Sequence, residues 1–247
     1  MIVDAHIHSG DFLGRKWNAE KLIKVMDKYK IDKAFISSEE AIVYGNDDAN
    51  KNLKENYIKP YEKRFIGYCV PNPYNSPGHE VEKCIESGYF QGIKLHPWYH
   101  KCPLSSSNYD SVFEIANQRS LPVLVHSGGT LNMPDFQYAL PEMFLNVAER
   151  YKDLVLIIGH MGLERWREVT ELVIDYDNIF LDITMSMPEK ARVEFAVEKV
   201  GAERVLLGTD MPLIDPAVSI GLVLGSSLST EDKEKILGAN LMRILEY

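Results

Sequence analysis

Cysteine is scarce in this chain of 247 residues, with three residues in all. Cys69, Cys84 and Cys102 are odd in number and form no CxxC pair, so a disulfide framework is not expected and reduced thiols are favoured. A long apolar run is also missing, because the longest one, 154–158, is far shorter than the roughly 20 residues that cross a bilayer. The sequence therefore fits neither a disulfide-stabilised scaffold nor a membrane-spanning protein.

Positive charge is scarce as well, with 27 Lys and Arg against 36 Asp and Glu and a net charge of −9. No basic run is present, so the chain is a poor candidate for binding nucleic acid or anionic lipid through its charge. The first residues, MIVDAHIHSG, lack a basic stretch and their apolar run is cut at Asp4, which excludes a signal peptide. We expect a soluble cytoplasmic protein that acts on a small molecule, without nucleic-acid or membrane partners. A homo-oligomer is expected only as the common default for such enzymes.

Glycine-rich phosphate-binding motifs are absent, since neither GxGxxG nor GxxxxGK[ST] occurs. Eight short apolar, β-branched runs are present instead, and their ends follow one another at intervals of about 29 residues, the length of a strand plus a crossover helix. The predicted strands cover 2–8, 32–38, 64–70, 91–96, 121–126, 154–160, 178–184 and 204–210.

The segments between these runs have helical periodicity. In 17–30, an apolar stripe recurs at helical spacing, and a second stripe follows the seventh strand; the stripes are Leu22, Ile23, Met26 and Tyr29, and Val193, Ala196, Val197 and Val200. Eight such units in about 250 residues predict a (β/α)8 TIM barrel, formed by a single domain over 1–247. An open doubly wound sheet is the alternative, but it lacks its usual nucleotide-binding signature.

Histidines gather where the predicted strands end. Of the seven in the chain, His6, His8, His96, His126 and His160 all lie at C-terminal strand ends, and Asp210 ends the eighth strand in the same way. That edge carries the active site in TIM barrels. A lone histidine is more often a core residue than a ligand, but five on one rim point to a functional site.

His6 and His8 are two residues apart on the first strand, so their imidazoles face the same side. Two imidazoles joined by a carboxylate suit Zn²⁺, Fe²⁺, Ni²⁺ or Mn²⁺. An HxH pair alone is a weak signal. It gains weight here from further strand-end motifs, namely VLVHSG at 123–128, IIGHMG at 157–162 and LLGTDMP at 206–212.

With these motifs the chain resembles the amidohydrolase superfamily, and more closely its amidohydrolase 2, or aminocarboxymuconate-semialdehyde-decarboxylase-like, branch. The resemblance runs from DAHIH at 4–8 through GIKLHP at 92–97 to LGANLMRIL at 237–245. It implies a metal site made by His6, His8, His126 and Asp210. It also implies that Asp210 and His160 are catalytic, with Asp210 handling a water proton and His160 polarising the substrate or holding a second ion. Asp4 is expected to orient one of the histidines.

Lys94 and His96 stand two residues apart on the fourth strand, so both could face the barrel interior. The resemblance implies two alternatives for Lys94, a carboxylated bridge between two metal ions or an ammonium that binds a substrate carboxylate or pairs with Asp182. His96 could line the substrate pocket or only pack above the barrel. We expect one divalent ion, zinc first, with two ions as the alternative that Lys94 would report.

The predicted function is a metal-dependent hydrolase that activates water for attack on an amide, ester or lactone carbonyl. The close alternative is a non-oxidative decarboxylase of an unsaturated or aromatic carboxylic acid, because the same branch contains such lyases. A TatD-type metal-dependent nuclease is a further alternative, but that family has a glutamate where this chain has Lys94, and the acidic chain offers no phosphate track. A non-catalytic barrel is the fourth, and the intact set of strand-end ligands argues against it.

Overall fold

The computed structural model describes residues 1–12, 14–45, 48–127, 137–184, 189 and 191–246. Its strands form one sheet, and all eight predicted strands are found in the predicted order, with every neighbouring pair parallel. They are β1 (Val3–Phe12), β3 (Lys33–Ser38), β4 (Phe65–Cys69), β5 (Phe90–Leu95), β6 (Val123–Val125), β7 (Leu156–Ile158), β8 (Ile179–Asp182) and β9 (Val205–Leu206). The TIM-barrel prediction is confirmed.

The barrel closes between its first strand and the chain that follows its last one. Backbone hydrogen bonds join Ala5 N to Leu207 O at 2.8 Å and Asp210 N to His6 O at 2.7 Å. A parallel bridge between Ile7 and Met211 continues this seam. The consequence for the site is that Asp210 is fixed beside the HxH strand by main-chain contacts.

Strand β2 (Arg15–Trp17) was not predicted from the sequence. It pairs antiparallel with the end of β1, so it extends the sheet past the barrel rim without joining the parallel series. Its three residues are too few for a periodic pattern to show.

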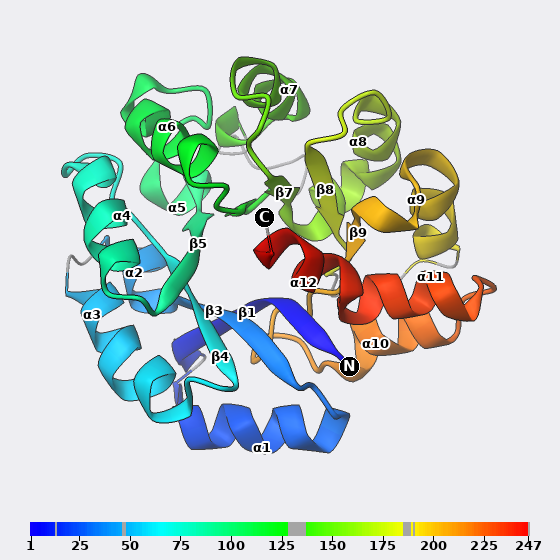
Figure 1. Ribbon diagram of the computed structural model, residues 1–247, viewed down its shortest axis with the longest axis horizontal. Coiled ribbons are helices and arrows are strands. Elements are labelled where there is room, and N and C mark those ends of the chain that lie inside the picture. Colours follow the sequence, from blue (N-terminus) through cyan, green and yellow to red (C-terminus); the bar gives the residue numbers. More distant parts are fainter. Residues whose placement is uncertain (13, 46–47, 128–136, 185–188, 190, 247) are drawn as a thin grey trace.

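Helices surround the strands (Figure 1). They are α1 (Ala19–Tyr29), α2 (Glu39–Tyr44), α3 (Ala49–Leu53), α4 (Pro77–Glu86), α5 (Pro97–His100), α6 (Asp110–Gln118), α7 (Pro141–Arg150), α8 (Trp166–Leu172), α9 (Arg192–Val200), α10 (Ala217–Leu224), α11 (Thr230–Glu234) and α12 (Asn240–Leu245). The Asn18 side chain, just before α1, accepts the Lys21 N–H, and Lys30, just after the helix, has a left-handed conformation.

The two predicted apolar stripes face the strands, as expected for crossover helices. Leu22 and Met26 of α1 are buried, as are Val193, Ala196 and Val200 of α9. Ile23, Tyr29 and Val197 are only partly buried, so they form the margins of the stripes. Helix α9 also buries a residue that no apolar pattern predicts, Arg192.

The barrel interior is a packed apolar core that is separate from the layer between strands and helices. It contains side chains from every parallel strand except β5 and two from the last helix: Val3, Ala5, Phe35, Ile66, Tyr68, Leu124, Ile157, Phe180, Leu206, Leu241 and Ile244. Helix α12 lies across the middle of the view in Figure 1 and covers the N-terminal opening of the barrel. Any functional opening must therefore be at the other end, where the strands finish.

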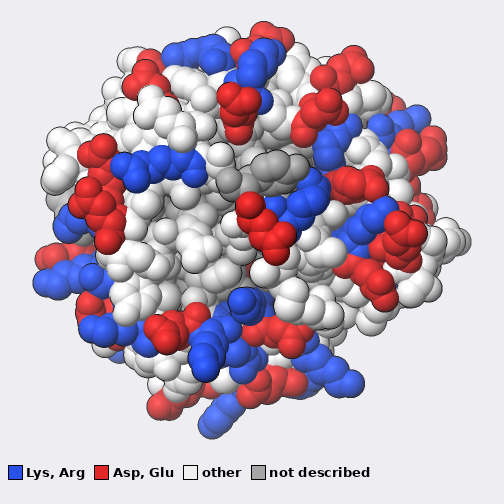
Figure 2. Space-filling view, viewed as in Figure 1, with Lys and Arg blue, Asp and Glu red and all other residues white. Residues whose placement is uncertain are grey.

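The surface covered by Figure 2 carries basic and acidic side chains side by side, without a stripe of one sign. Within the described residues, no helix is long and apolar enough to cross a membrane. The three cysteines are free and buried.

Candidate metal centre

Three side chains from the two sides of the barrel seam, the first strand and the segment after the last strand, converge on one point. His6 and His8 extend from β1, and Asp210 follows β9. His6 Nε2 lies 3.2 Å from His8 Nε2, and Asp210 Oδ1 lies 2.9 Å from His8 Nε2 and 3.6 Å from His6 Nε2. Among the described residues, this is the group of buried ligand atoms close enough to hold one metal ion. The HxH strand and Asp210 are thus brought together as the sequence predicted.

The remaining ring nitrogens decide which lone pairs face this point. His6 Nδ1 contacts Asp182 Oδ2 at 2.7 Å, and a carboxylate can only accept, so the His6 proton is on Nδ1. His8 Nε2 donates to Asp210 Oδ1 at 2.9 Å. His8 Nδ1 lies 2.9 Å from Ser37 Oγ and 3.8 Å from the Glu39 carboxylate, so it could carry the proton instead when a metal ion takes the Nε2 lone pair. Both Nε2 atoms would then offer lone pairs to the ion beside a carboxylate oxygen. Two imidazoles and a carboxylate so arranged fit a divalent transition-metal ion.

Lys94 is fully buried in the same cluster, and its Nζ donates a hydrogen bond to His6 Nε2 at 2.8 Å. Burial lowers its pKa to about 8, against the opposing effect of the carboxylates of Asp210 and Asp182. Burial, and then the Lys94 charge, lower the pKa of His6 to about 3. Lys94 therefore faces the barrel interior as predicted, and His6 is a neutral imidazole near pH 7.

Asp210 is a carboxylate although it is buried. Burial alone would raise its pKa, but the hydrogen bond with His8 and the charges of nearby histidines hold the pKa well below its usual range. Its backbone has φ of 59°, a left-handed conformation that non-glycine residues seldom adopt. The seam contact from Asp210 N to His6 O maintains this conformation.

His126, His160 and His96 form a second group of rings next to the first. His160 Nε2 lies 3.1 Å from His126 Nδ1, and the His96 ring stacks on His126 at 3.9 Å with 12° between the planes. The His160 and His6 rings are 5.0 Å apart. His126, expected as a metal ligand, contacts His160 here and is not within the compact group of ligand atoms, so its role stays a proposal.

The His160 backbone begins a left-handed turn. His160, Met161 and Gly162 have φ values of 59°, 52° and 88°, and Leu163 follows at 50°. Each non-glycine residue in this region costs roughly 1 kcal/mol, so surrounding contacts must maintain the turn. One is Ser127, whose Oγ donates to Gly159 O at 2.5 Å and accepts from Gly162 N at 3.0 Å.

Asp4 does not orient a histidine ring. Its carboxylate accepts from His6 N and Thr209 N, each at 3.0 Å, and from Thr209 Oγ1 at 2.5 Å, so it joins the first and last strands through main chain and hydroxyl. Asp182, at the end of β8, makes the ring contact instead. The His6 contact holds the pKa of Asp182 at about 2 despite its burial.

Glu39 is a further residue of the site that the sequence reasoning did not single out. It is the first residue of α2, directly after β3, and its carboxylate approaches His8 Nδ1 at 3.8 Å. Burial raises its pKa. Its place just beyond the second strand end was the signal that could have marked it.

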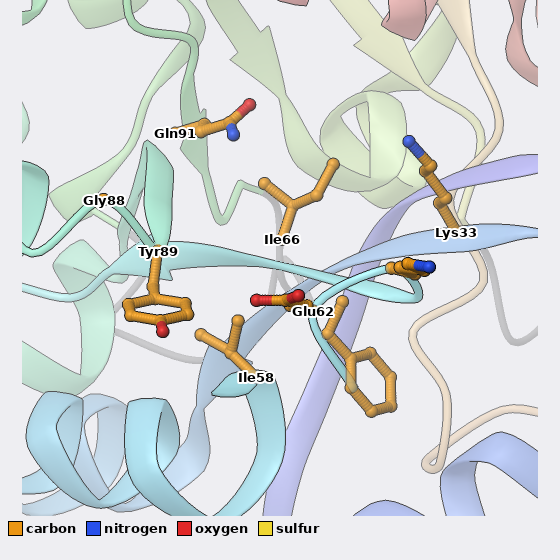
Figure 3. A pocket seen from close by; sticks show the side chains of 9 residues that line it. Lys33, Ile58, Glu62, Ile66, Gly88, Tyr89 and Gln91 are labelled. Atoms are coloured by element: carbon orange, nitrogen blue, oxygen red, sulfur yellow. The ribbon is translucent and has the colours of Figure 1, made fainter. Parts of the chain in front are cut away.

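The hollow in Figure 3 is not part of this site. It encloses about 520 Å³ and is lined by residues that include Lys33 and Phe65, the first residues of β3 and β4, and Gly88 and Tyr89, which precede β5. It therefore lies at the N-terminal ends of the strands, opposite the histidines.

A family model described as "Amidohydrolase", Amidohydro_2, matches residues 3–246. The chain belongs to this family of metal-dependent enzymes, within the amidohydrolase superfamily, as the resemblance of its motifs predicted. No curated protein sequence matches the chain.

Several solved structures of low sequence identity share the fold. A 2,6-dihydroxybenzoate decarboxylase complexed with 2,6-dihydroxybenzoate has a TM-score of 0.83 at 15% identity, covering 100% of this chain and 99% of that one. A 5-carboxyvanillate decarboxylase from Sphingomonas paucimobilis has a TM-score of 0.76 at 14% identity, covering 99% and 98%. A dihydroxybenzoic acid decarboxylase from Polaromonas sp. JS666, with bound manganese and 2-nitroresorcinol, has a TM-score of 0.79 at 15% identity, covering 99% and 96%.

Proposed function

We propose that the protein is a metal-dependent, non-oxidative decarboxylase of a small aromatic carboxylic acid. The observation that carries this proposal is a buried ammonium, Lys94, beside the convergent group of His6, His8 and Asp210. A buried cation next to a metal position suits an anionic substrate. A neutral amide or lactone would not require that cation. The likeness to decarboxylases that act on hydroxylated benzoates also favours decarboxylation over hydrolysis. Hydrolysis, the main prediction from the sequence, becomes the alternative.

His6, His8 and Asp210 would hold the ion, with His126 as a further candidate ligand. When bound, a divalent ion would polarise substrate oxygens and stabilise negative charge. Manganese is present in two of the related structures, and zinc remains equally compatible with this donor set. Asp182 orients His6 through the Nδ1 contact, which keeps the Nε2 lone pair directed at the site.

Lys94 would bind the substrate carboxylate. Its ammonium now donates to the lone pair of His6 Nε2 that a metal ion would also need, and one lone pair cannot serve both. Metal binding would therefore release Lys94 towards the substrate. An unmodified Lys94 accords with a single ion, since an ammonium cannot ligate a second cation.

Decarboxylation breaks the bond between ring carbon and carboxylate and replaces it with a carbon–hydrogen bond, so a proton must reach that carbon. Asp210 would relay this proton, because its carboxylate lies among the ligands. It would accept the proton of a ring hydroxyl of the substrate and donate it to the ring carbon as CO₂ leaves, and water would then return a proton to the hydroxyl oxygen. His160, whose ring lies 5.0 Å from that of His6, would polarise the substrate. The planar His96 ring and Tyr99, 4.6 Å apart, could pack against an aromatic ring.

The test is product analysis with the metal-loaded protein. Manganese- or zinc-loaded protein is incubated with 2,6-dihydroxybenzoate, other hydroxybenzoates and 5-carboxyvanillate, and in parallel with aryl esters, lactones and amides. We expect release of CO₂ and the decarboxylated phenol, lost on chelation and in Asp210→Asn. Cleavage of an ester, lactone or amide without CO₂ from any acid would overturn the proposal in favour of hydrolysis.

A further inference from the structure

Arg192 is a buried cation that the proposed chemistry does not use. It is 0% exposed, and it stands at the first residue of α9, where the helix dipole disfavours positive charge. Burial lowers its pKa to about 10, which still leaves it charged near neutral pH. A guanidinium in this place costs free energy that an apolar residue would not, so its contacts must account for it.

Those contacts converge on the turn that carries His160. Arg192 Nη2 donates to the His160 carbonyl oxygen at 2.7 Å, and Nε points at Met161 Sδ at 3.4 Å. The guanidinium also lies over the Trp166 ring, 5.4 Å from its centroid. Its Nη1 has no hydrogen-bond partner among the residues that the structure describes. The strongest contact of Arg192 is therefore to the main chain of a proposed catalytic residue.

That main chain is strained, and two side chains hold it by hydrogen bonds. His160 and Met161 are left-handed, and Gly162 and Leu163 also have positive φ. Ser127, just beyond β6, fastens the turn through Gly159 and Gly162, while Arg192, from α9, fastens it at His160 itself. Without the Arg192 contact, the His160 peptide could relax and rotate the imidazole away from the His6 ring.

We propose that Arg192 is a positioning residue, which fixes the His160 imidazole at the site by holding the His160 carbonyl oxygen in the left-handed turn. This role rests on the proposed function, in which His160 acts on the substrate. A guanidinium is suited to it because its donors are planar and fixed, whereas a lysine ammonium presents a point charge.

The first test is a comparison of Arg192→Met with Arg167→Met. Arg167 is exposed and stacks on the same Trp166 ring, 4.3 Å from its centroid, but no contact joins it to His160. Histidine side-chain ¹H–¹⁵N spectra are recorded on zinc-loaded, diamagnetic protein, with the His160 signals assigned by their loss in His160→Gln. We expect the His160 signals to move in Arg192→Met and to stay in place in Arg167→Met.

The second readout is kinetic. With an acid that proves to be a substrate, Arg192→Met should lower kcat roughly 10- to 100-fold with little change in KM, because a misplaced group costs the reaction more than binding. Guanidinium ion at low millimolar concentration should restore part of kcat in Arg192→Met and none in His160→Gln. Arg167→Met should resemble the unmodified protein in both constants.

If Arg192→Met does not fold, Arg192→Lys and Ser127→Ala take its place, and both should move the His160 signals, with Arg192→Lys retaining less than the full kcat. Folded Arg192 variants with unchanged His160 signals and unchanged kcat would overturn the inference and leave Arg192 as a packing residue. The spectrum needs no substrate. A shifted His160 signal in a protein that releases no CO₂ would therefore support the positioning role while contradicting the proposed decarboxylation.

Discussion

Lys94 and a metal ion compete for one lone pair on His6, so removing the ammonium should have opposite effects on two measurements. We expect Lys94→Met to bind zinc or manganese more tightly, because no buried cation then repels the ion. We expect the same variant to raise KM for a carboxylate substrate by roughly 10-fold or more, because a charge-assisted contact is lost. Isothermal titration with metal, and steady-state kinetics at saturating metal, give the two values. Weaker metal binding in Lys94→Met would show that Lys94 supports the ion, as a carboxylated bridge would.

Asp210 is expected to combine ligation with proton transfer. Asp210→Asn keeps the shape but removes the group that accepts a proton, so kcat should fall by roughly 10²-fold or more at saturating metal. Asp215→Asn makes the same change of charge at an exposed position five residues away and should leave kcat unchanged. Turnover in Asp210→Asn within a few-fold of the unmodified protein would assign the proton to another group.

At the scale of elements, the position of the Asp182 carboxylate at the end of β8 depends on a glycine, Gly208, in the segment after β9. A Cβ placed on Gly208 would lie 2.0 Å from Asp182 Oδ1 and 2.5 Å from Thr184 Oγ1, so only glycine leaves room for the carboxylate that orients His6. Gly208→Ala should displace Asp182 and weaken metal affinity roughly 10- to 100-fold.

The matched control is Gly221→Ala in α10, where an added Cβ meets nothing within 4 Å. It should leave metal affinity unchanged and stabilise the fold by up to about 1 kcal/mol. Metal titration and urea unfolding of both variants check these results. Equal metal affinity in the two variants would mean that Asp182 does not control the His6 ring.

The strands and the HxH pair were predictable because each depends on a local pattern. Alternating β/α runs locate the barrel, and strand ends at His6, His8 and Asp210 locate its rim. The sequence could not predict that Asp182, and not Asp4, orients the His6 ring. This depends on which carboxylate reaches the ring in three dimensions, and Asp182 reaches it from β8. The contact of Arg192 with His160, 32 positions away along the chain, likewise has no periodic signal.

For the whole molecule, the buried histidines predict acid sensitivity. Burial lowers the pKa of His96, His126 and His160, and that of His6 to about 3. In the unfolded chain each titrates near 6.5, so below this pH the unfolded state binds more protons. The part of the stability that comes from these neutral histidines is fully present above pH 6.5 and is lost as the pH falls, by at most about 1.4 kcal/mol per pH unit for each histidine.

Urea unfolding of the metal-free protein at pH 7 and pH 5 measures this effect as a change in the free energy of unfolding. His160→Gln should lose about one histidine's share of the pH dependence. Equal free energies of unfolding at the two pH values would show that these rings are accessible to protons in the folded state.

The central claim is that one divalent transition-metal ion binds where His6, His8 and Asp210 converge. The most direct measurement is anomalous diffraction at the metal absorption edge, from crystals of protein purified without chelator and supplied with zinc or manganese. The account predicts one anomalous peak within bonding distance of His6 Nε2, His8 Nε2 and Asp210 Oδ1, with Lys94 Nζ moved off His6. No peak at this position under either metal, or a peak bound by other residues, would contradict it.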